Sequence, residues 1–207
     1  MNWDEQFKEG QGRYYPAEEL VRFLGRKLGS VTKCGGKGLN ALEIGCGVGG
    51  NIKALADWGF FIYGLDISQQ AIKLAREHAS IAGFANAVHF SQYTAPDSTK
   101  LPSKSINLCI DIQTIQHLSL QQHEQMYKEV YRVLHHGGIF FSIHWAGIQK
   151  SREQIFPNHP EIDGWHQPII LENMLETTGF RVTYFETVVK TYGMYIGKWA
   201  ILEAVKE

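Results

Sequence analysis

The stretch Ala41-Leu42-Glu43-Ile44-Gly45-Cys46-Gly47-Val48-Gly49-Gly50-Asn51 decides the fold. An apolar run that contains one acidic residue, Glu43, ends at closely spaced glycines, and a helical pattern then begins at Asn51. We therefore predict a buried strand, a tight turn and the start of a helix. Free backbone N–H groups and missing side chains at such a turn let a cofactor come close. In doubly wound α/β sheets this turn follows the first strand.

The glycine spacing fits two cofactor motifs. Gly45, Gly47 and Gly50 satisfy the dinucleotide pattern, whereas Glu43 followed by Gly45, Gly47 and Gly49 satisfies an acidic-x-Gly-x-Gly-x-Gly pattern. Glu43 favours the second motif, because its charge would repel a pyrophosphate and attract a cofactor that carries an ammonium and a sulfonium. With this motif the chain resembles the class I S-adenosylmethionine-dependent methyltransferases.

Three further stretches extend the resemblance in the right order. Asp66 follows an apolar run about 20 residues after the glycines, where the family places an acidic side chain. Leu101-Pro102 with Ser105-Ile106-Asn107-Leu108 resembles a stretch of the family that usually has an aspartate at the position of Asn107. Residues 132–138 resemble the family's Arg-x-Leu-x-Pro-Gly-Gly turn, with His136 in place of the proline. The resemblance covers about residues 40–143.

Periodicity along the chain predicts alternating strands and helices. Apolar runs predict strands, and stripes of apolar residues with N-cap serines predict helices. The predicted strands are 40–44, 60–66, 88–90, 106–112, 139–143, 180–189 and 195–204. The predicted helices open at 16–19, at 51 and after the N-caps Ser68 and Ser119, with another at 168–177. This alternation predicts an α/β fold, a doubly wound, mostly parallel seven-stranded sheet with helices on both faces and a C-terminal antiparallel hairpin.

Length and composition predict a single domain over residues 1–207. At 207 residues and 44% hydrophobic, the chain is long enough for one core. Within it we expect an N-terminal helical lid segment (1–30), a cofactor-binding core (40–145), and an acceptor loop, helix and edge hairpin (146–207). The loop is expected at 154–167.

Charge and cysteine usage limit the function classes. A net charge of −1 without a dense basic run argues against a nucleic-acid footprint. The three cysteines lack the spacing of metal ligands, which indicates a reduced, cytoplasmic protein. We predict no metal site, because His159, His166 and the other histidines are scattered along the chain. An apolar run of about 18 residues, as a membrane span needs, is absent from the sequence. We predict no membrane partner and leave the oligomeric state open.

The resemblance implies S-adenosyl-L-methionine as cofactor and S-adenosyl-L-homocysteine as product. Asp66 is expected to bind the ribose hydroxyls and Ile67 to cover one face of the adenine. Thr94 stands where the family often has an aspartate on the adenine amino group, so the adenine contact is open. The implied cofactor-binding residues are Glu43, Gly45, Cys46, Gly47, Gly49, Asn51, Asp66, Ile67, Thr94, Ala95, Asp111 and Gln113.

Methyl transfer needs alignment of the acceptor and exclusion of water, and a general base only when the acceptor loses a proton. The candidates for catalytic roles follow strands four and five: Asp111, His117 and His144. Each has an alternative structural role, Asp111 as a strand-end residue and the histidines as hydrogen-bonded packing residues. Residues 111–114 lack the Asp/Asn-Pro-Pro-aromatic element of amino-methylating DNA enzymes, and no cysteine follows a proline. A small-molecule acceptor remains.

Two other functions stay open from the sequence. One is a nicotinamide-dependent oxidoreductase on a similar sheet, against which Glu43 and the tail hairpin count. The other is a protein that binds S-adenosylmethionine without turnover, which the changes at Asn107 and Thr94 leave possible.

Overall fold

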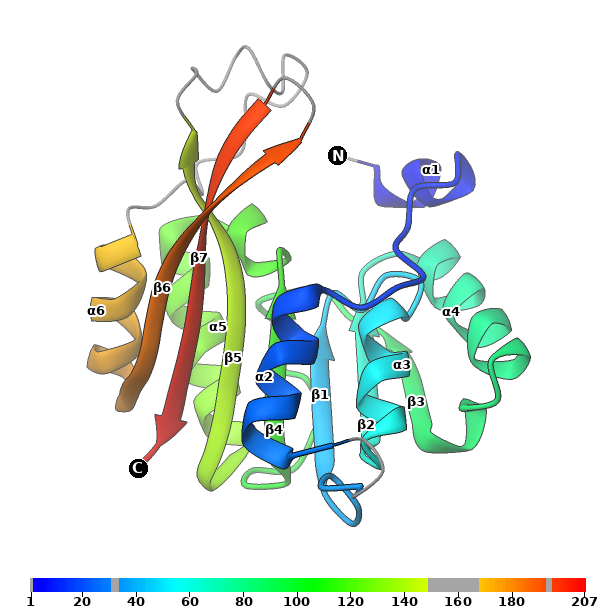
Figure 1. Ribbon diagram of the computed structural model, residues 1–207, viewed down its shortest axis with the longest axis horizontal. Coiled ribbons are helices and arrows are strands. Elements are labelled where there is room, and N and C mark those ends of the chain that lie inside the picture. Colours follow the sequence, from blue (N-terminus) through cyan, green and yellow to red (C-terminus); the bar gives the residue numbers. More distant parts are fainter. Residues whose placement is uncertain (1, 31–33, 149–167, 193–194) are drawn as a thin grey trace. The chain divides into compact units, whose positions relative to one another are not determined.

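The computed structural model describes residues 2–30, 34–148, 168–192 and 195–207 (Figure 1). Seven strands form one mixed sheet in the order β3-β2-β1-β4-β5-β7-β6. The strands are β1 Asn40–Ile44, β2 Phe61–Asp66, β3 Val88–Gln92, β4 Ile106–Ile112, β5 Leu134–Ile148, β6 Phe180–Tyr192 and β7 Tyr195–Lys206. The α/β fold predicted from the sequence, with its C-terminal antiparallel strands, is confirmed. The loop expected at 154–167 lies outside the described residues.

Helices occupy the connections between the strands. The α-helices are α1 Trp3–Lys8, α2 Glu18–Leu28, α3 Gly50–Asp57, α4 Gln69–Ile81, α5 Leu120–Val133 and α6 Pro168–Thr178, and short 3-10 turns are η2 Ala85–Ala87 and η3 Ile115–His117. Helix α1 is not among the predicted helices. Its sequence signals are local and short: Asn2 caps it through a side-chain bond from the Glu5 N–H, and Asp4 and Glu5 occupy its first turn.

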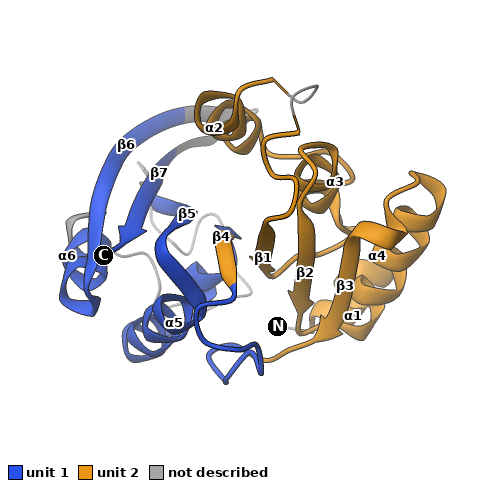
Figure 2. Ribbon diagram, turned by 90° about the horizontal axis from the view of Figure 1, so that it is seen from below, with its two compact units in different colours: residues 1, 95–105, 111–207 blue, residues 2–94, 106–110 orange. Residues whose placement is uncertain are grey.

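The described chain divides into two compact units (Figure 2). The N-terminal unit comprises residues 2–94 and 106–110, and the C-terminal unit comprises residues 95–105 and 111–207. In the N-terminal unit, β1, β2 and β3 pair in parallel, with Ile44 opposite Leu65 and Gly64 opposite Phe90. Buried residues of these strands and of α2, α3 and α4 form its core, among them Phe23, Leu42, Ile52, Ile62, Ala75 and Phe90.

The C-terminal unit is built on the antiparallel strands β5, β7 and β6. Ile139 pairs with Val205, and Phe180 pairs with Lys206. Ser119 and Gln122 form the predicted capping box at the start of α5. The apolar stripe of this helix, Met126, Val130 and Val133, is fully buried, and aromatic contacts join Tyr127 to Phe140 and Phe140 to Phe180.

One boundary differs from the prediction. The Gly137-Gly138 pair was expected to end the helix, and strand five to begin at 139. The helix instead ends at Val133, and Leu134 is already extended and buried. The Lys206 ammonium donates to the backbone oxygens of Tyr131 and Leu134, at 2.5 and 2.9 Å, and so satisfies helix-end carbonyls from a strand far along the chain.

Candidate functional site

The glycine turn between β1 and α3 has the backbone that only glycine adopts readily. Gly45, Gly47 and Gly49 have φ of 71, 51 and 84°. Gly49 is the N-cap of α3, in the left-handed conformation. A side chain at Gly47 or Gly49 would therefore strain the turn, even where space exists for it.

The N–H groups of this turn are used within the fold. Gly45 and Cys46 both donate to the Leu65 carbonyl at 2.7 and 2.9 Å, and Gly49 donates to Cys46 at 2.9 Å. The N–H of Gly47 donates to Asp66 Oδ2 at 2.8 Å. The expectation of free N–H groups at the turn is therefore wrong for these four: three of them hold the turn against β2, and that of Gly49 closes the turn on Cys46.

Glu43 is a carboxylate enclosed at the end of β1. Its side chain is fully buried, and Oε1 accepts a bond of 2.8 Å from Asn51 Nδ2. Asn51 lies in the first turn of α3, so the helix start and the strand end are joined through this pair. The structure thus brings together Glu43 and Asn51, as the sequence predicted for one site.

Asp66 ends β2 and faces the glycine turn. Its Oδ1 accepts from the Ser68 N–H at 2.9 Å, and its Oδ2 accepts from the Gly47 N–H. Burial, first of all, raises the pKa of this carboxyl above its ordinary value, and the nearby Asp4 charge adds to the rise while the backbone bonds oppose it. An ionised carboxylate has about four acceptor positions. Both oxygens therefore keep acceptor capacity for further donors.

The remaining predicted cofactor residues of the N-terminal unit lie around these two acids. Cys46 is buried in the turn, and burial, followed by the charges of Asp66 and Glu43, raises the pKa of its thiol well above the ordinary value. Ile67 is 47% exposed directly after β2, as an apolar side chain open to a ligand would be. Thr94 is exposed. Its neighbour Tyr93 donates its N–H to the Asp66 carbonyl at 2.8 Å, which holds residue 94 near the end of β2.

In the C-terminal unit, Asp111 is the centre of a buried polar cluster. Its Oδ1 accepts from the N–H groups of Thr114 and Ile115 at 2.9 and 3.0 Å. Its Oδ2 accepts from Ser142 Oγ at 2.8 Å and lies 3.3 Å from His144 Nε2. Asp111 and His144 are 0 and 1% exposed. The structure therefore brings together two of the three predicted catalytic residues, in an enclosed pair.

Burial dominates the electrostatics of the cluster. It raises the pKa of Asp111, against the opposing effect of the hydrogen bonds from Ile115, Ser142 and Thr114. Because every oxygen of Asp111 already accepts bonds inside the protein, this residue is placed to orient His144 and the loop after β4. Its direct contact with a cofactor or acceptor stays a prediction.

His123 belongs to the same cluster and was missed by sequence reasoning. It is fully buried on α5, its ring centroid is 6.0 Å from that of His144, and its Nδ1 lies 2.9 Å from the Ser119 carbonyl. Since a carbonyl only accepts, Nδ1 carries the proton. The signal was present: His123 stands three residues before Met126, at the spacing of the buried stripe of α5.

The other predicted residues of this unit lie on the loop after β4. His117 ends η3 and is half-buried. Gln113 has a positive φ of 69°, uncommon for a residue other than glycine, and its N–H donates to the Ile143 carbonyl at 2.9 Å. Gln116 accepts a bond of 2.8 Å from the Trp145 N–H through Oε1. Ala95 is half-buried at the start of the other segment of this unit.

In the described ranges, no group of three or more His, Cys, Asp or Glu side chains is arranged to hold a metal ion. Of the helices that the structure describes, none combines the length and the apolar character that a bilayer crossing requires. All three cysteines, Cys34, Cys46 and Cys109, are free thiols.

The chain is similar to known methyltransferases. Residues 42–142 match the methyltransferase domain family. Over 221 aligned residues the chain is 25% identical to a sterol 24-C-methyltransferase of Yarrowia lipolytica, covering 94% of this chain and 55% of that protein. The chain spans about half the length of this curated relative.

Solved structures share the fold at low identity. The crystal structure of the cyclase SpnF aligns with a TM-score of 0.72 and 19% identity, over 91% of this chain and 80% of that one. A geranyl diphosphate C-methyltransferase of Streptomyces coelicolor, solved with Mg²⁺, geranyl diphosphate and S-adenosyl-L-homocysteine, aligns with a TM-score of 0.71 and 13% identity, over 91% of this chain and 78% of that one.

Proposed function

We propose that this chain, whose residues 42–142 match the methyltransferase domain family, transfers a methyl group from S-adenosyl-L-methionine to a small-molecule acceptor. The cofactor would lie at the glycine turn of the N-terminal unit, with S-adenosyl-L-homocysteine as the product that leaves. When bound, it supplies an activated methyl group on a positively charged sulphur.

The observation that carries this proposal is the buried Glu43 carboxylate, which lies at a turn whose N–H groups already donate hydrogen bonds within the protein. A dinucleotide pyrophosphate needs free N–H donors and no fixed negative charge nearby. At this turn, four N–H groups donate within the protein, and Glu43 lies fully buried beside them. The chemistry of the turn suits a cationic cofactor and opposes a pyrophosphate.

The residues present fit the cofactor at three points. Asp66 retains acceptor capacity on both oxygens for two ribose hydroxyls. Asn51 holds the Glu43 carboxylate in place through its amide. The half-exposed Ile67 offers an apolar surface for the adenine. The residue that would take the adenine amino group is the exposed Thr94 or a backbone group beside it.

On the acceptor side, the Asp111–His144 pair is the candidate for handling a proton. A carboxylate beside an imidazole fixes its orientation and favours its protonated form. Because His144 Nε2 lies 3.3 Å from Asp111 Oδ2, we assign His144 to receiving a proton that the acceptor loses, with Asp111 as its orienting partner. His117 is the alternative base. An acceptor that loses no proton would use neither.

The nature of the acceptor rests on the relatives. The sterol methyltransferase, an ajmaline N-methyltransferase of Rauvolfia serpentina and the geranyl diphosphate methyltransferase are named for small molecules. We propose a small molecule for this chain also, with neither nucleic acid nor membrane as the acceptor. The three free thiols favour a reducing compartment such as the cytoplasm.

The competing function is chemistry other than methyl transfer on the same fold. SpnF is named as a cyclase, so this architecture serves more than one reaction. The second candidate is therefore a chain that binds the cofactor without transferring its methyl group.

Labelled methyl transfer separates these functions. The protein is incubated with methyl-labelled S-adenosylmethionine and a panel of small metabolites, and the label is traced by mass spectrometry. We expect one compound class to gain a methyl group, and Asp66→Ala to abolish the transfer. Cofactor binding without any labelled product across a broad panel would favour the non-transferring alternative, and binding of NAD(H) in its place would exclude the proposal.

A further inference from the structure

An N-terminal segment, residues 2–17, lies across the glycine turn. Helix α1 contacts α4, and Figure 1 shows it beyond the upper end of that helix. The Phe7 ring is close enough that a Cβ at Gly47 would meet it at 3.7 Å. A Cβ at Gly50 would lie 2.2 Å from the Arg13 carbonyl oxygen and 2.8 Å from that of Tyr15, so this backbone leaves no room for a side chain there.

The segment is connected to Glu43 and to Asp66 by hydrogen bonds that pass through one residue in each case, Asn51 and Ser68 respectively. The Ala17 N–H donates to Asn51 Oδ1 at 2.9 Å, and the same amide donates to Glu43 at 2.8 Å. On the other side, Asp4 Oδ1 accepts from Ser68 Oγ at 2.5 Å, while the Ser68 N–H donates to Asp66 Oδ1 at 2.9 Å.

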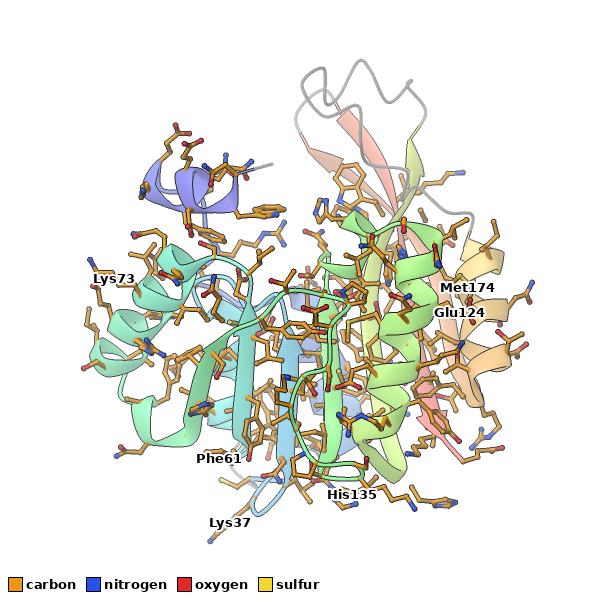
Figure 3. All side chains as sticks on the ribbon, turned by 180° about the vertical axis from the view of Figure 1, so that it is seen from behind. Lys37, Phe61, Lys73, Glu124, His135 and Met174 are labelled. Atoms are coloured by element: carbon orange, nitrogen blue, oxygen red, sulfur yellow. The ribbon has the colours of Figure 1, made fainter. Side chains whose placement is uncertain are left out.

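Asp4 also completes the start of α4. Its Oδ1 accepts from the Gln70 N–H at 3.1 Å, while Ser68 Oγ caps the helix by accepting from the Ala71 N–H at 3.0 Å. The hydrogen bond from Ser68, first of all, lowers the pKa of Asp4. Two carboxylates, Asp4 and Asp66, thus share Ser68 at the positive end of one helix. Lys73, further along α4, lies at the outer side of this helix (Figure 3).

We propose that Asp4 is a positioning residue for Asp66: by fixing Ser68 from the N-terminal segment, it holds the Asp66 carboxylate in the orientation that receives the cofactor ribose. This inference rests on the proposed cofactor site. The Asp4 carboxylate fixes the Ser68 hydroxyl, the Ser68 backbone N–H fixes Asp66 Oδ1, and Asp66 Oδ2 is then set against Gly47. A mobile N-terminal segment would leave Asp66 free to rotate, at a cost in affinity for any ligand with a ribose.

A double-mutant cycle tests the proposal. Binding of S-adenosylhomocysteine is measured by calorimetry on the full chain for wild type, Asp4→Ala, Asp66→Ala and the double variant. We expect Asp4→Ala to weaken binding about five- to fiftyfold in the wild-type background and less than about twofold in the Asp66→Ala background. Such non-additivity is a readout that a general loss of stability would not produce.

Two variants serve as controls. Asp4→Asn keeps a side-chain oxygen that accepts from Ser68 and Gln70, so we expect it to restore affinity to within about twofold of wild type. Glu5→Ala removes the neighbouring acidic residue of the same helix turn, whose side chain is exposed, and should leave affinity unchanged. If Asp4→Ala proves unstable, Asp4→Leu, which has a similar shape and no acceptor oxygen, takes its place in the cycle, and affinity equal to wild type in Asp4→Leu would overturn the role of Asp4.

The outcomes separate this inference from the proposed function. If wild type fails to bind S-adenosylhomocysteine, the cofactor assignment fails and the inference fails with it. If wild type binds and Asp4→Ala binds equally well, or weakens binding to the same degree in both backgrounds, only the role of Asp4 is overturned.

Discussion

Asp66 and Asp111 both lie at the carboxyl ends of strands, yet their surroundings assign them different work. Asp66 faces two backbone N–H groups at the glycine turn and keeps acceptor capacity, whereas Asp111 accepts from Thr114, Ile115 and Ser142 and lies against His144. The sequence marked both as strand-end acids. It could not show that Asp111 is enclosed, because the partners of Asp111 come from a loop and from a strand about thirty residues away, and only the fold brings them together.

Cofactor affinity should depend on pH through Asp66. The ionised carboxylate is the better acceptor for ribose hydroxyls, and burial raises its pKa above the ordinary value of 3.8. Affinity is therefore full above the raised pKa and is lost as the pH falls through it, at a higher pH than for an exposed aspartate. Calorimetry with S-adenosylhomocysteine from neutral pH to about pH 4 measures this. In Asp66→Asn the acid limb should disappear; an identical limb in that variant would contradict the assignment.

Replacing Asp111 should destabilise the fold strongly. Asp111→Ala leaves buried donors of Thr114, Ile115, Ser142 and His144 without their acceptor, which costs about 3–5 kcal/mol of unfolding free energy. Asp111→Asn keeps one oxygen for the two backbone donors and should cost less. Ser142→Ala removes a single hydrogen bond, at about 1 kcal/mol. Urea unfolding gives all three values. A loss below about 1 kcal/mol in Asp111→Ala would show that the cluster is not the enclosed network described.

At the scale of elements, much of the fold followed from local signals. Strands 40–44 and 106–112 were predicted with the observed bounds, and Ser68 and Ser119 mark the starts of α4 and α5 as expected. The end of α5 could not be predicted from local signals. The helix ends at Val133, before the glycine pair, and Lys206 from the last strand donates to the carbonyls of Tyr131 and Leu134 there. The contacts of the N-terminal segment with Asn51 and Ser68 were equally hidden, since each joins residues far apart in the chain.

The two N-cap serines offer a matched comparison. Each hydroxyl accepts from a backbone N–H three residues on, so Ser68→Ala and Ser119→Ala should each lower stability by about 1 kcal/mol. Only Ser68 also donates to Asp4. Ser68→Ala should therefore weaken S-adenosylhomocysteine binding as well, and Ser119→Ala should not. Thermal unfolding and calorimetry on the two variants give both readouts; equal effects on binding would contradict a special role for the start of α4.

Two helical glycines provide a second pair. Alanine at Gly50 suits a helix, but its methyl group would overlap the Arg13 carbonyl, so residues 13–15 should be displaced and cleavage by trypsin after Arg13 should accelerate. Gly25 in α2 has no atom within 4 Å of an added Cβ. Gly25→Ala should stabilise the protein by about 0.5–1 kcal/mol without affecting cleavage. Unchanged cleavage in Gly50→Ala would show that the segment does not lie on this turn in solution.

At the scale of the whole molecule, the chain passes repeatedly between its two units. Strand β4 contributes residues 106–110 to one unit and its last residues to the other, and residues 95–105 belong to the C-terminal unit although they precede β4. Neither unit is a continuous piece of chain. We therefore expect one cooperative unfolding transition, with coincident midpoints by tryptophan fluorescence and far-UV circular dichroism. Two separated transitions would contradict the single domain predicted from the sequence.

Calorimetric titration with S-adenosylhomocysteine, against NAD(H) under the same conditions, tests the central claim most directly. The account predicts saturable one-to-one binding of S-adenosylhomocysteine, weakened at least about tenfold in both Glu43→Ala and Asp66→Ala, with no heat beyond dilution from NAD(H). Binding of NAD(H) with no response to S-adenosylhomocysteine, or equal affinity in wild type and both variants, would contradict it.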